Sequence, residues 1–374
     1  MKVAVIGTVA SSIIGFRRDF INSLIAQGHQ VYAFAVDYTD ETRHKVVELG
    51  AVPIEYLFNR TGINPVHDVF NTLRLAKQLK AIKPDMVFSY FSKPVIFGTL
   101  AAKLAGVERR VAMLEGLGFI FTDQPEGLSR KTRLLRQIQV LLYRLSFSLL
   151  EKIIFLNPDD PKDLVVKYNL KVKRVEVLGG IGLDLAQYPY VKPDVECISF
   201  LFVGRLLKEK GINEFVTAAK IVKQQYPQMI FSILGGLDEG NPGGLKATEL
   251  NQLNDSGVID YSGHVTNVAE RIARCSVFVL PSYREGVPRS TQEAMAIGRP
   301  VITTDVPGCR ETIIDGVNGF MVPPWQPQAL ADKMIYFIEH PEHIETMGLE
   351  SYKLAQEKFD AAKVNRKLLK LLEL

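Results

Sequence analysis

Apolar runs of strand length alternate with segments of helical period through most of this 374-residue chain. Helical patterns include Val66–Ile82 and Ser129–Leu150. Strands rich in Val and Ile that alternate with helices are typical of a parallel sheet covered on both faces, so the pattern predicts an α/β fold. The strand candidates of the first half are Lys2–Gly7, Gln30–Val36, Pro53–Phe58, Asp85–Tyr90, Arg110–Glu115, Lys152–Leu156 and Val175–Leu178.

The alternation stops at Gly179–Asp194, a stretch with three Gly and two Pro, and then resumes. A chain of this length suits two domains of roughly 150–200 residues. We therefore predict a Rossmann-like domain at residues 1–180, a linker at 181–195, a second Rossmann-like domain at 196–350, and a C-terminal helix at 351–374 that packs back towards the first domain. The second series of strands is Ser199–Gly204, Met229–Gly235, Val258–Ser262, Val277–Pro281 and Pro300–Thr304, and a single final helix is expected at about Gly348–Leu372.

The composition is that of a folded protein, and the charge is unevenly distributed along the chain. With 47% hydrophobic and 23% charged residues, the chain is typical of a folded globular protein. Residues 1–190 carry 25 Lys and Arg against 18 Asp and Glu, whereas residues 191–374 carry 20 against 23. The basic first half indicates an anionic partner such as phosphate or an acidic lipid, with a solvated basic surface as the alternative.

Three widely spaced cysteines, Cys197, Cys275 and Cys309, lack metal-ligand spacing and favour reduced thiols in the cytoplasm. The start of the chain does not resemble a signal peptide, and no apolar run reaches 18 residues. These features predict a soluble or peripheral protein.

The segment Gly204–Gly211 follows an apolar strand and precedes a helix that is expected to begin near Ile212. Glycines and a helix N-terminus favour the binding of phosphate, and Arg205 and Lys210 would add positive charge. The alternative is an ordinary basic loop.

A second constellation, at Pro281–Ala296, follows another buried-type strand and continues into a helix. It places Glu285 in a strand-end loop and Glu293 eight residues later in the next helix. Two such carboxylates can accept hydrogen bonds from different hydroxyls of one ligand, which suits a sugar and a ribose. The alternative, a helix N-terminus enriched in Glu, explains Glu293 less well because that residue lies further into the helix.

The sequence EGVPRSTQE at Glu285–Glu293 resembles the Glu-x7-Glu motif of retaining glycosyltransferases with the GT-B architecture, in particular glycosyltransferase family 4. Gly204–Gly211 is similar to the phosphate loop of that family. The resemblance implies two Rossmann-like domains that face each other across a cleft. It implies that Arg205 and Lys210 hold the donor diphosphate, that Glu293 binds ribose and that Glu285 binds the transferred sugar. It also places Gly7, Thr8, Gly204, Gly286, Val287 and Pro288 around the donor.

Two segments, EGLGFIFTDQ at Glu115–Gln124 and LGGLDEGNP at Leu234–Pro242, resemble a narrower group that extends polyprenyl-diphosphate-linked glycans. Bacterial N-acetylgalactosaminyltransferases of surface-glycan assembly are an example. The resemblance to this group implies a UDP-sugar donor and a lipid-linked acceptor. Many members carry a His where this chain has Glu115, so Glu115 is a candidate contact to the sugar or acceptor, or a cap of the Gly116–Gly118 turn.

The segment Ser129–Leu150 combines a Leu- and Ile-rich face with basic residues. Such a helix can lie on an anionic bilayer, or it can be a buried helix with a basic end. On the membrane interpretation the contacts are Arg130, Lys131, Arg133 and Arg136, and the protein is peripheral on the inner face of the plasma membrane.

No metal site is predicted, because the chain has neither HExxH nor Asp-x-Asp. Arg205, Lys210 and helix amides would then stabilise the leaving diphosphate, and no cofactor or nucleic-acid partner is expected. We therefore predict a retaining, metal-independent hexosyl- or N-acetylhexosaminyltransferase. The alternatives are a sugar-nucleotide epimerase with the same architecture and a non-catalytic nucleotide-sugar-binding protein.

Overall fold

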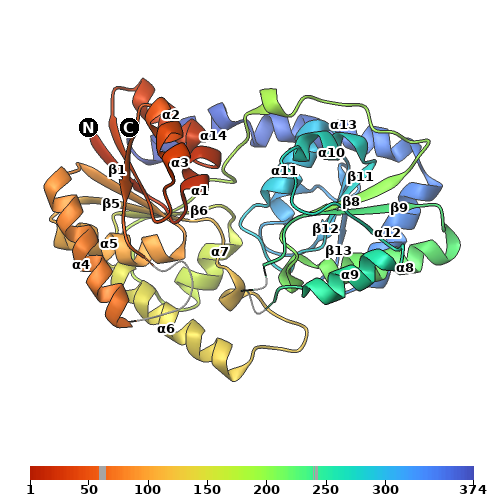
Figure 1. Ribbon diagram of the computed structural model, residues 1–374, viewed down its shortest axis with the longest axis horizontal. Coiled ribbons are helices and arrows are strands. Elements are labelled where there is room, and N and C mark those ends of the chain that lie inside the picture. The colour runs from red at the N-terminus through yellow and green to blue at the C-terminus, as the bar shows by residue number, and fades with distance from the viewer. Residues whose placement is uncertain (59–64, 239, 241–242) are drawn as a thin grey trace. The chain divides into compact units, whose positions relative to one another are not determined.

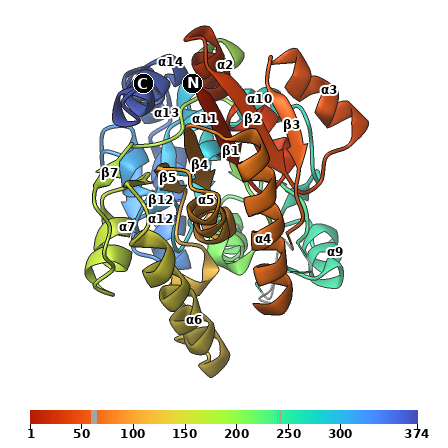
Figure 2. The same ribbon diagram turned by 90° about the vertical axis from the view of Figure 1, so that its left-hand side faces the viewer.

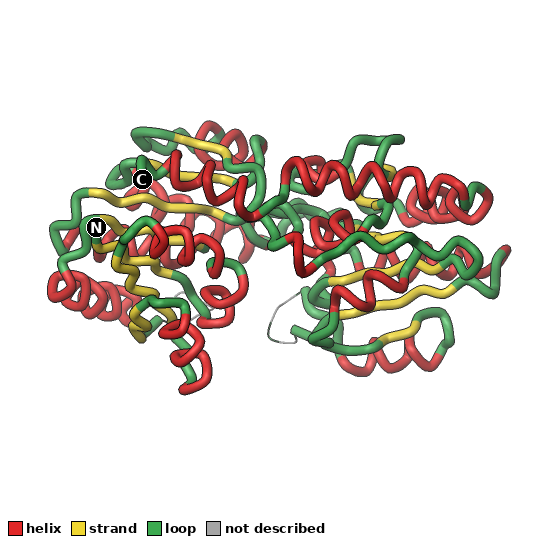
Figure 3. Tube along the Cα trace, turned by 90° about the horizontal axis from the view of Figure 1, so that it is seen from above, coloured by secondary structure: helices red, strands yellow, loops and turns green. Residues whose placement is uncertain are grey.

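The computed structural model describes residues 1–58, 65–238, 240 and 243–374 (Figure 1). The chain forms two compact units, each with its own sheet between layers of helices (Figure 3). Unit 1 comprises Met1–Ile120, Ser129–Ile181 and Val364–Leu374, and unit 2 comprises Phe121–Leu128 and Gly182–Lys363. Phe121–Leu128 therefore belongs to the second unit although it lies within the predicted first domain.

Unit 1 contains seven strands in the order β3-β2-β1-β4-β5-β6-β7, and each neighbouring pair is parallel. The central strand β4 is buried along its whole length, as expected for a sheet covered on both faces. The bounds are β1 (Lys2–Ile6), β2 (Gln30–Ala35), β3 (Val52–Glu55), β4 (Met86–Tyr90), β5 (Arg109–Leu114), β6 (Lys152–Phe155) and β7 (Val175–Val177).

The helices of unit 1 bury one face against this sheet. Leu75 and Leu79 of α4 pack in one core cluster with Phe34 of β2 and Val87 of β4. Helix α6 begins where predicted, because the Ser129 side chain accepts a hydrogen bond from the Thr132 N–H at 3.1 Å. The helices are α1 (Ala10–Gly15), α2 (Arg18–Ala26), α3 (Asp40–Glu48), α4 (Pro65–Ile82), η1 (Pro94–Gly98), α5 (Thr99–Leu104), η2 (Phe119–Phe121), α6 (Arg130–Phe147), α7 (Asp159–Pro161) and η3 (Lys162–Val166).

Unit 2 contains six strands in the order β10-β9-β8-β11-β12-β13, again with parallel neighbours. The edge strand β13 was not predicted; it begins at a glycine, which is depleted in strands. The strands are β8 (Ser199–Val203), β9 (Ile230–Leu234), β10 (Asp260–Tyr261), β11 (Val277–Leu280), β12 (Val301–Thr304) and β13 (Gly319–Val322). The helices are η4 (Leu185–Gln187), η5 (Lys208–Lys210), α8 (Ile212–Gln225), α9 (Ala247–Asp255), α10 (Val268–Arg274), α11 (Arg289–Ile297), η6 (Arg310–Thr312), α12 (Pro327–Glu339) and α13 (Glu342–Lys358).

The prediction of one final helix was wrong, because α13 ends at Lys358 and a separate helix, α14 (Ala361–Leu371), follows. At the break the chain pairs with Leu183, and Asp360 Oδ1 accepts from the Ala362 N–H at 2.8 Å. The Leu183 N–H donates to the Phe359 carbonyl at 2.7 Å, and the Leu183 carbonyl accepts from the Ala361 N–H at 2.8 Å. The end of the chain then contacts unit 1, where Arg109 donates to the Leu372 carbonyl at 2.5 Å.

All three cysteines are free, and two of them are buried. Burial raises the pKa of the Cys275 and Cys309 thiols to about 12. Since the thiolate is the reactive form, we expect one thiol per chain, Cys197, to react with a disulfide reagent at pH 8, and the others to react roughly 10³-fold more slowly. Measurement on the native and the denatured chain, with Cys197→Ser as control, tests this. A second fast thiol in the native protein would contradict it.

Candidate active site

The order of strands in unit 2 reverses between β8 and β11. From β8 the sheet continues through β9 to β10, and from β11 it continues through β12 to β13. Ligands of open parallel sheets bind beyond the carboxyl ends of the strands at such a point of reversal. The two predicted motifs follow these two strands, Gly204–Gly211 after β8 and Pro281–Pro288 after β11. The topology therefore brings both motifs to one edge of the sheet.

The two loops meet through an ion pair that links residues 75 positions apart. Lys210 Nζ donates to Glu285 Oε1 at 2.5 Å, and Ser282 Oγ donates to the same oxygen at 2.7 Å. The two charged side chains are largely buried. The structure thus joins a predicted phosphate ligand to a predicted sugar ligand and adds Ser282, which the sequence reasoning missed.

Backbone packing locks the two loops together beneath this pair. The Tyr283 N–H donates to the Glu209 carbonyl at 2.9 Å, and the Tyr283 hydroxyl donates to Glu214 Oε1 at 2.7 Å. Gly211 has a φ of 75°, and a Cβ there would overlap the Pro281 carbonyl. Only glycine fits such a position, so backbone packing fixes the two loops against each other.

Glu293 lies on α11 with one oxygen occupied and one available. Its Oε1 accepts from the Tyr188 hydroxyl at 2.9 Å and from Arg289 Nε at 3.0 Å. Its Oε2 has no partner among the described residues, and the side chain remains 12% exposed. Burial, together with the Glu293 charge, raises the pKa of Tyr188 to about 12, which keeps this phenol a donor. Two donors therefore orient the carboxylate while its second oxygen can accept a ligand hydroxyl.

Two helix N-termini face loops of this site. The N-cap residues, Gly211 of α8 and Pro288 of α11, give their helices no side-chain cap, and a helix N-terminus favours the binding of an anion. Gly286, Val287 and Pro288 lead directly into α11, and the Val287 carbonyl accepts from Gln292 Nε2 at 3.2 Å. At the start of the other loop, the Gly204 N–H donates to Leu234, which ties the loop to β9.

Arg205 is the more exposed of the two predicted cations. Its side chain is 54% exposed and donates to Asp238 Oδ2 at 2.8 Å. Asp238 belongs to the predicted LGGLDEGNP motif, of which Glu239, Asn241 and Pro242 lie outside the described residues. A pair exposed to this extent is weak, so an incoming diphosphate can compete for Arg205.

Glu209 is a further acidic residue of this site that the sequence reasoning did not single out. Its side chain is buried between the two motifs, and Oε2 has no partner in the part of the chain that the structure describes. Burial raises the pKa of this carboxyl, while the charges of Arg205 and Lys210 oppose the shift. Its peptide carbonyl anchors Tyr283, so the residue also supports the geometry of the loops.

In unit 1 the strand order reverses between β1 and β4. Gly7 and Thr8 follow β1, and their carbonyls accept from the Tyr56 hydroxyl at 2.6 Å and from the Val36 N–H at 2.9 Å. A Cβ at Gly7 would overlap the phenol of Tyr90, which ends β4. The next residue, Phe91, has a φ of 68°, a strained conformation of the kind that gathers at functional sites.

Glu115 follows β5 and forms a buried ion pair with Arg17, whose guanidinium lies 4.7 Å from the centroid of the Tyr90 ring. The structure pairs one oxygen of the Glu115 carboxylate with Arg17, and both roles of Glu115, a contact to sugar or acceptor and a cap of the Gly116–Gly118 turn, stay predictions. Arg17 was missed because it lies between two short helices with no motif around it. Its proximity to Tyr90 places Glu115 close to the reversal point of unit 1.

The predicted membrane contacts do not all face the same way. Arg130, Lys131 and Arg133 of α6 are exposed. Arg136 is half-buried, and its Nε donates to the Ile120 carbonyl at 2.7 Å. The helix turns Arg136 towards its own unit, so this side chain is less available to a bilayer than the other three, and the membrane contact stays a prediction for all four residues. Within the described ranges no helix is long and apolar enough to cross a bilayer.

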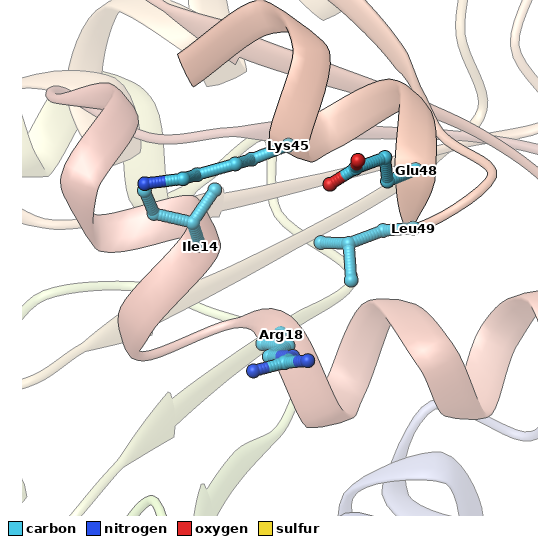
Figure 4. Close-up of a pocket in the computed structure, with 5 residues that line it drawn as sticks. All are labelled: Ile14, Arg18, Lys45, Glu48 and Leu49. Carbon is cyan, nitrogen blue, oxygen red and sulfur yellow. The ribbon is translucent and has the colours of Figure 1, made fainter. Parts of the chain in front are cut away.

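A cavity of about 440 Å³ lies among α1, α2 and α3 of unit 1, lined by Ile14, Arg18, Lys45, Glu48 and Leu49 (Figure 4). It holds none of the predicted site residues and is formed by helices instead of strand ends. Apart from residues 59–64, 239, 241 and 242, no group of three or more His, Cys, Asp or Glu could hold a metal ion.

Comparisons with known proteins agree with this arrangement. Residues 2–157 match the glycosyl transferase 4-like family and residues 192–354 match glycosyl transferases group 1. The N,N'-diacetylbacillosaminyl-diphospho-undecaprenol alpha-1,3-N-acetylgalactosaminyltransferase of Campylobacter jejuni is 31% identical over 352 residues, with 91% of this chain and 90% of the relative covered. The Escherichia coli UDP-Gal:alpha-D-GlcNAc-diphosphoundecaprenol alpha-1,3-galactosyltransferase is 26% identical, with 70% and 68% covered.

Among solved structures, Anabaena Alr3699/HepE in complex with UDP and glucose superimposes with a TM-score of 0.79 at 17% identity. It covers 100% of this chain and 99% of that one. The predicted fold class is thereby confirmed, and so is the family resemblance. The chain is a member of the GT-B glycosyltransferases, with a glycosyl transferase 4-like first half and a group 1 second half.

Proposed function

We propose that this enzyme transfers a hexosamine or hexose from a UDP-sugar to a hydroxyl of a polyprenyl-diphosphate-linked glycan, with retention of the anomeric configuration. The observation that carries the proposal is the contact between Lys210 and Glu285 at the reversal point of unit 2. The two relatives named above, whose names give undecaprenol-diphosphate-linked sugars as acceptors, support the acceptor class. The name of the E. coli relative supports a UDP-sugar donor.

The donor would bind along the two loops of unit 2. Arg205 and Lys210, with amides of α8, would hold the diphosphate, and Gly204 lets the phosphates approach the backbone. Glu293 would accept a ribose hydroxyl on its available oxygen.

The transferred sugar would lie against the second loop. Glu285, which Lys210 and Ser282 hold in place, would accept from sugar hydroxyls, while amides near Gly286, Val287 and Pro288 position the sugar and the phosphate. In unit 1, Gly7 and Thr8 would line the approach of phosphates and acceptor, and Glu115 would contact the sugar or acceptor.

Transfer would take place on one face of the sugar. The bond from the anomeric carbon to the diphosphate oxygen breaks as a bond forms on the same face to the acceptor oxygen, and the departing diphosphate takes the acceptor proton. Catalysis then rests on positioning and on stabilising the charge of the leaving group by Arg205, Lys210 and helix amides.

The alternatives of an epimerase and of a non-catalytic binding protein are not favoured. The relatives named above are transferases, and an epimerase does not account for the paired carboxylates Glu285 and Glu293. We place the enzyme in the cytoplasm, on the inner face of the plasma membrane, where its acceptor is anchored by its lipid.

An assay with purified protein, a panel of UDP-sugars and a short-chain polyprenyl-diphosphate-linked saccharide tests the proposal. We expect one UDP-sugar to support transfer, and NMR of the product to show the donor's anomeric configuration. Epimerised donor without transfer would favour the first alternative, and binding without turnover would favour the second.

The transfer should not need a metal ion. We expect full activity in excess EDTA, because Arg205, Lys210 and helix amides supply the positive charge that a metal ion supplies elsewhere. Rates are measured with EDTA and then with added Mg²⁺ or Mn²⁺. Loss of activity that either metal restores would contradict this account of the leaving group.

A further inference from the structure

Helix α4 carries an apolar stripe that the described residues of its own unit leave exposed. Val66, Val69, Phe70 and Leu73 recur at the spacing i, i+3, i+4, i+7, and each is between 54% and 73% exposed. The opposite face of α4, with Leu75 and Leu79, is the one buried against the sheet. Four large apolar side chains exposed on one helix face mark an interaction surface.

A second stripe of the same kind lies on α6. Leu134, Leu141 and Leu145 are each more than half exposed and share one face of the helix. Both helices contact η1, and Figure 2 shows them at the same lower side of unit 1. A cavity of about 220 Å³ spans the space between them, with a lining that includes Asp68 of α4, Phe97, and Leu135 and Leu142 of α6. The two stripes therefore lie on neighbouring helices of unit 1, and we call them together the α4–α6 face.

The charges around the α4–α6 face are almost entirely positive. Helix α6 contains no Asp or Glu, and it exposes Arg130, Lys131, Arg133 and Arg144. Helix α4 exposes Arg74, Lys77 and Lys80, and its single acid, Asp68, is buried and lies 3.6 Å from Lys93. An apolar stripe bordered by cations fits an anionic bilayer. Two copies of this face would repel each other, which argues against self-association.

We propose that the α4–α6 face is a membrane-docking surface, in which the α4 stripe enters the hydrocarbon boundary of an anionic bilayer while the basic residues of α6 contact lipid head groups. This inference rests on the proposed function, because a lipid-linked acceptor places the reaction at a bilayer. It adds α4 as the element that inserts, whereas the sequence pattern singled out α6 alone.

Insertion of α4 into a bilayer can be measured by tryptophan fluorescence at a position on the stripe and at a control position outside it. The chain has a single tryptophan, Trp325 in unit 2, so a Trp325→Phe background leaves an added tryptophan as the reporter. We compare Phe70→Trp with Leu104→Trp, since Leu104 of α5 is 60% exposed and lies outside the face. With phosphatidylglycerol vesicles whose acyl chains carry bromine, Phe70→Trp should be quenched and Leu104→Trp should not. Equal quenching at both positions, or none at position 70, would overturn the inference.

Substitutions on α4 and on α6 separate the apolar contribution to vesicle binding from the electrostatic contribution. Phe70→Ser with Leu73→Ser should lower the vesicle partition coefficient about tenfold or more, because apolar area no longer enters the bilayer. The control Leu104→Ser with Val166→Ser, at equally exposed positions on other elements, should leave it unchanged. Replacing Arg130, Lys131 and Arg133 with Gln should reduce binding mainly at low salt. Arg136 is left intact because it supports Ile120.

Two further measurements keep this test distinct from the proposed function. The Phe70→Ser, Leu73→Ser protein should retain its rate on a short-chain, water-soluble acceptor and lose rate on acceptor embedded in vesicles. If the wild type transfers to neither acceptor, the proposed function fails, while the quenching data still decide the surface. A dimer in analytical ultracentrifugation without lipid, which becomes a monomer in the Phe70→Ser, Leu73→Ser protein, would show that the α4–α6 face binds a second copy. The membrane inference would then be wrong.

Discussion

Replacing Lys210 or Arg205 with alanine is expected to lower kcat by on the order of 10²–10³-fold, the effect of removing one preorganised donor to a developing charge. Both cations lie in the loop after β8, and the charge they would stabilise grows as the diphosphate leaves. Single-turnover rates at saturating donor measure the effect.

Lys208→Ala is the matched control for this pair. Lys208 lies in the same loop, but its side chain is paired with Glu126 and does not contact Glu285. We expect a near wild-type rate for it. Because Lys210→Ala also removes the partner of Glu285, Lys210→Met and the melting temperature of each variant show whether the loop still folds. Wild-type rates for both Lys210→Ala and Arg205→Ala would remove these residues from the diphosphate site.

Glu293→Ala is expected to weaken donor affinity by roughly 10- to 150-fold, since a hydrogen bond to a charged group contributes about 1.5–3 kcal/mol. Tyr188 and Arg289 orient the carboxylate through Oε1, which leaves Oε2 to accept from ribose. Calorimetric titration with UDP measures the loss directly.

Glu270→Ala serves as the control, because Glu270 is an exposed acid on α10, where it accepts from Asn267. Glu293→Gln, which retains one acceptor, should lose less affinity than Glu293→Ala. An unchanged dissociation constant in Glu293→Ala would place the ribose elsewhere.

Local sequence patterns were sufficient for most of the elements and for the order of the motifs. Apolar runs predicted the strands that became β8 and β11, and the placement of Arg205 and Glu285 in the loops after these strands follows from that prediction. Such features depend on near neighbours in the chain, through side-chain periodicity and backbone conformation. The family resemblance added roles to positions that the spacing had already selected.

Contacts between distant segments were decided by the tertiary structure alone. The sequence contained no sign that Arg17 would pair with Glu115, that Tyr188 would orient Glu293, or that Leu183 would pair with the segment between the two final helices. Helix α4 shows the reason most clearly. Its periodicity predicted a helix at Val66–Ile82, yet apolar residues occupy both of its faces, and only packing against the sheet determined that Leu75 and Leu79 are buried while Phe70 and Leu73 are exposed. A pattern of spacing specifies what a segment can form, whereas burial depends on which other segments the chain brings against it.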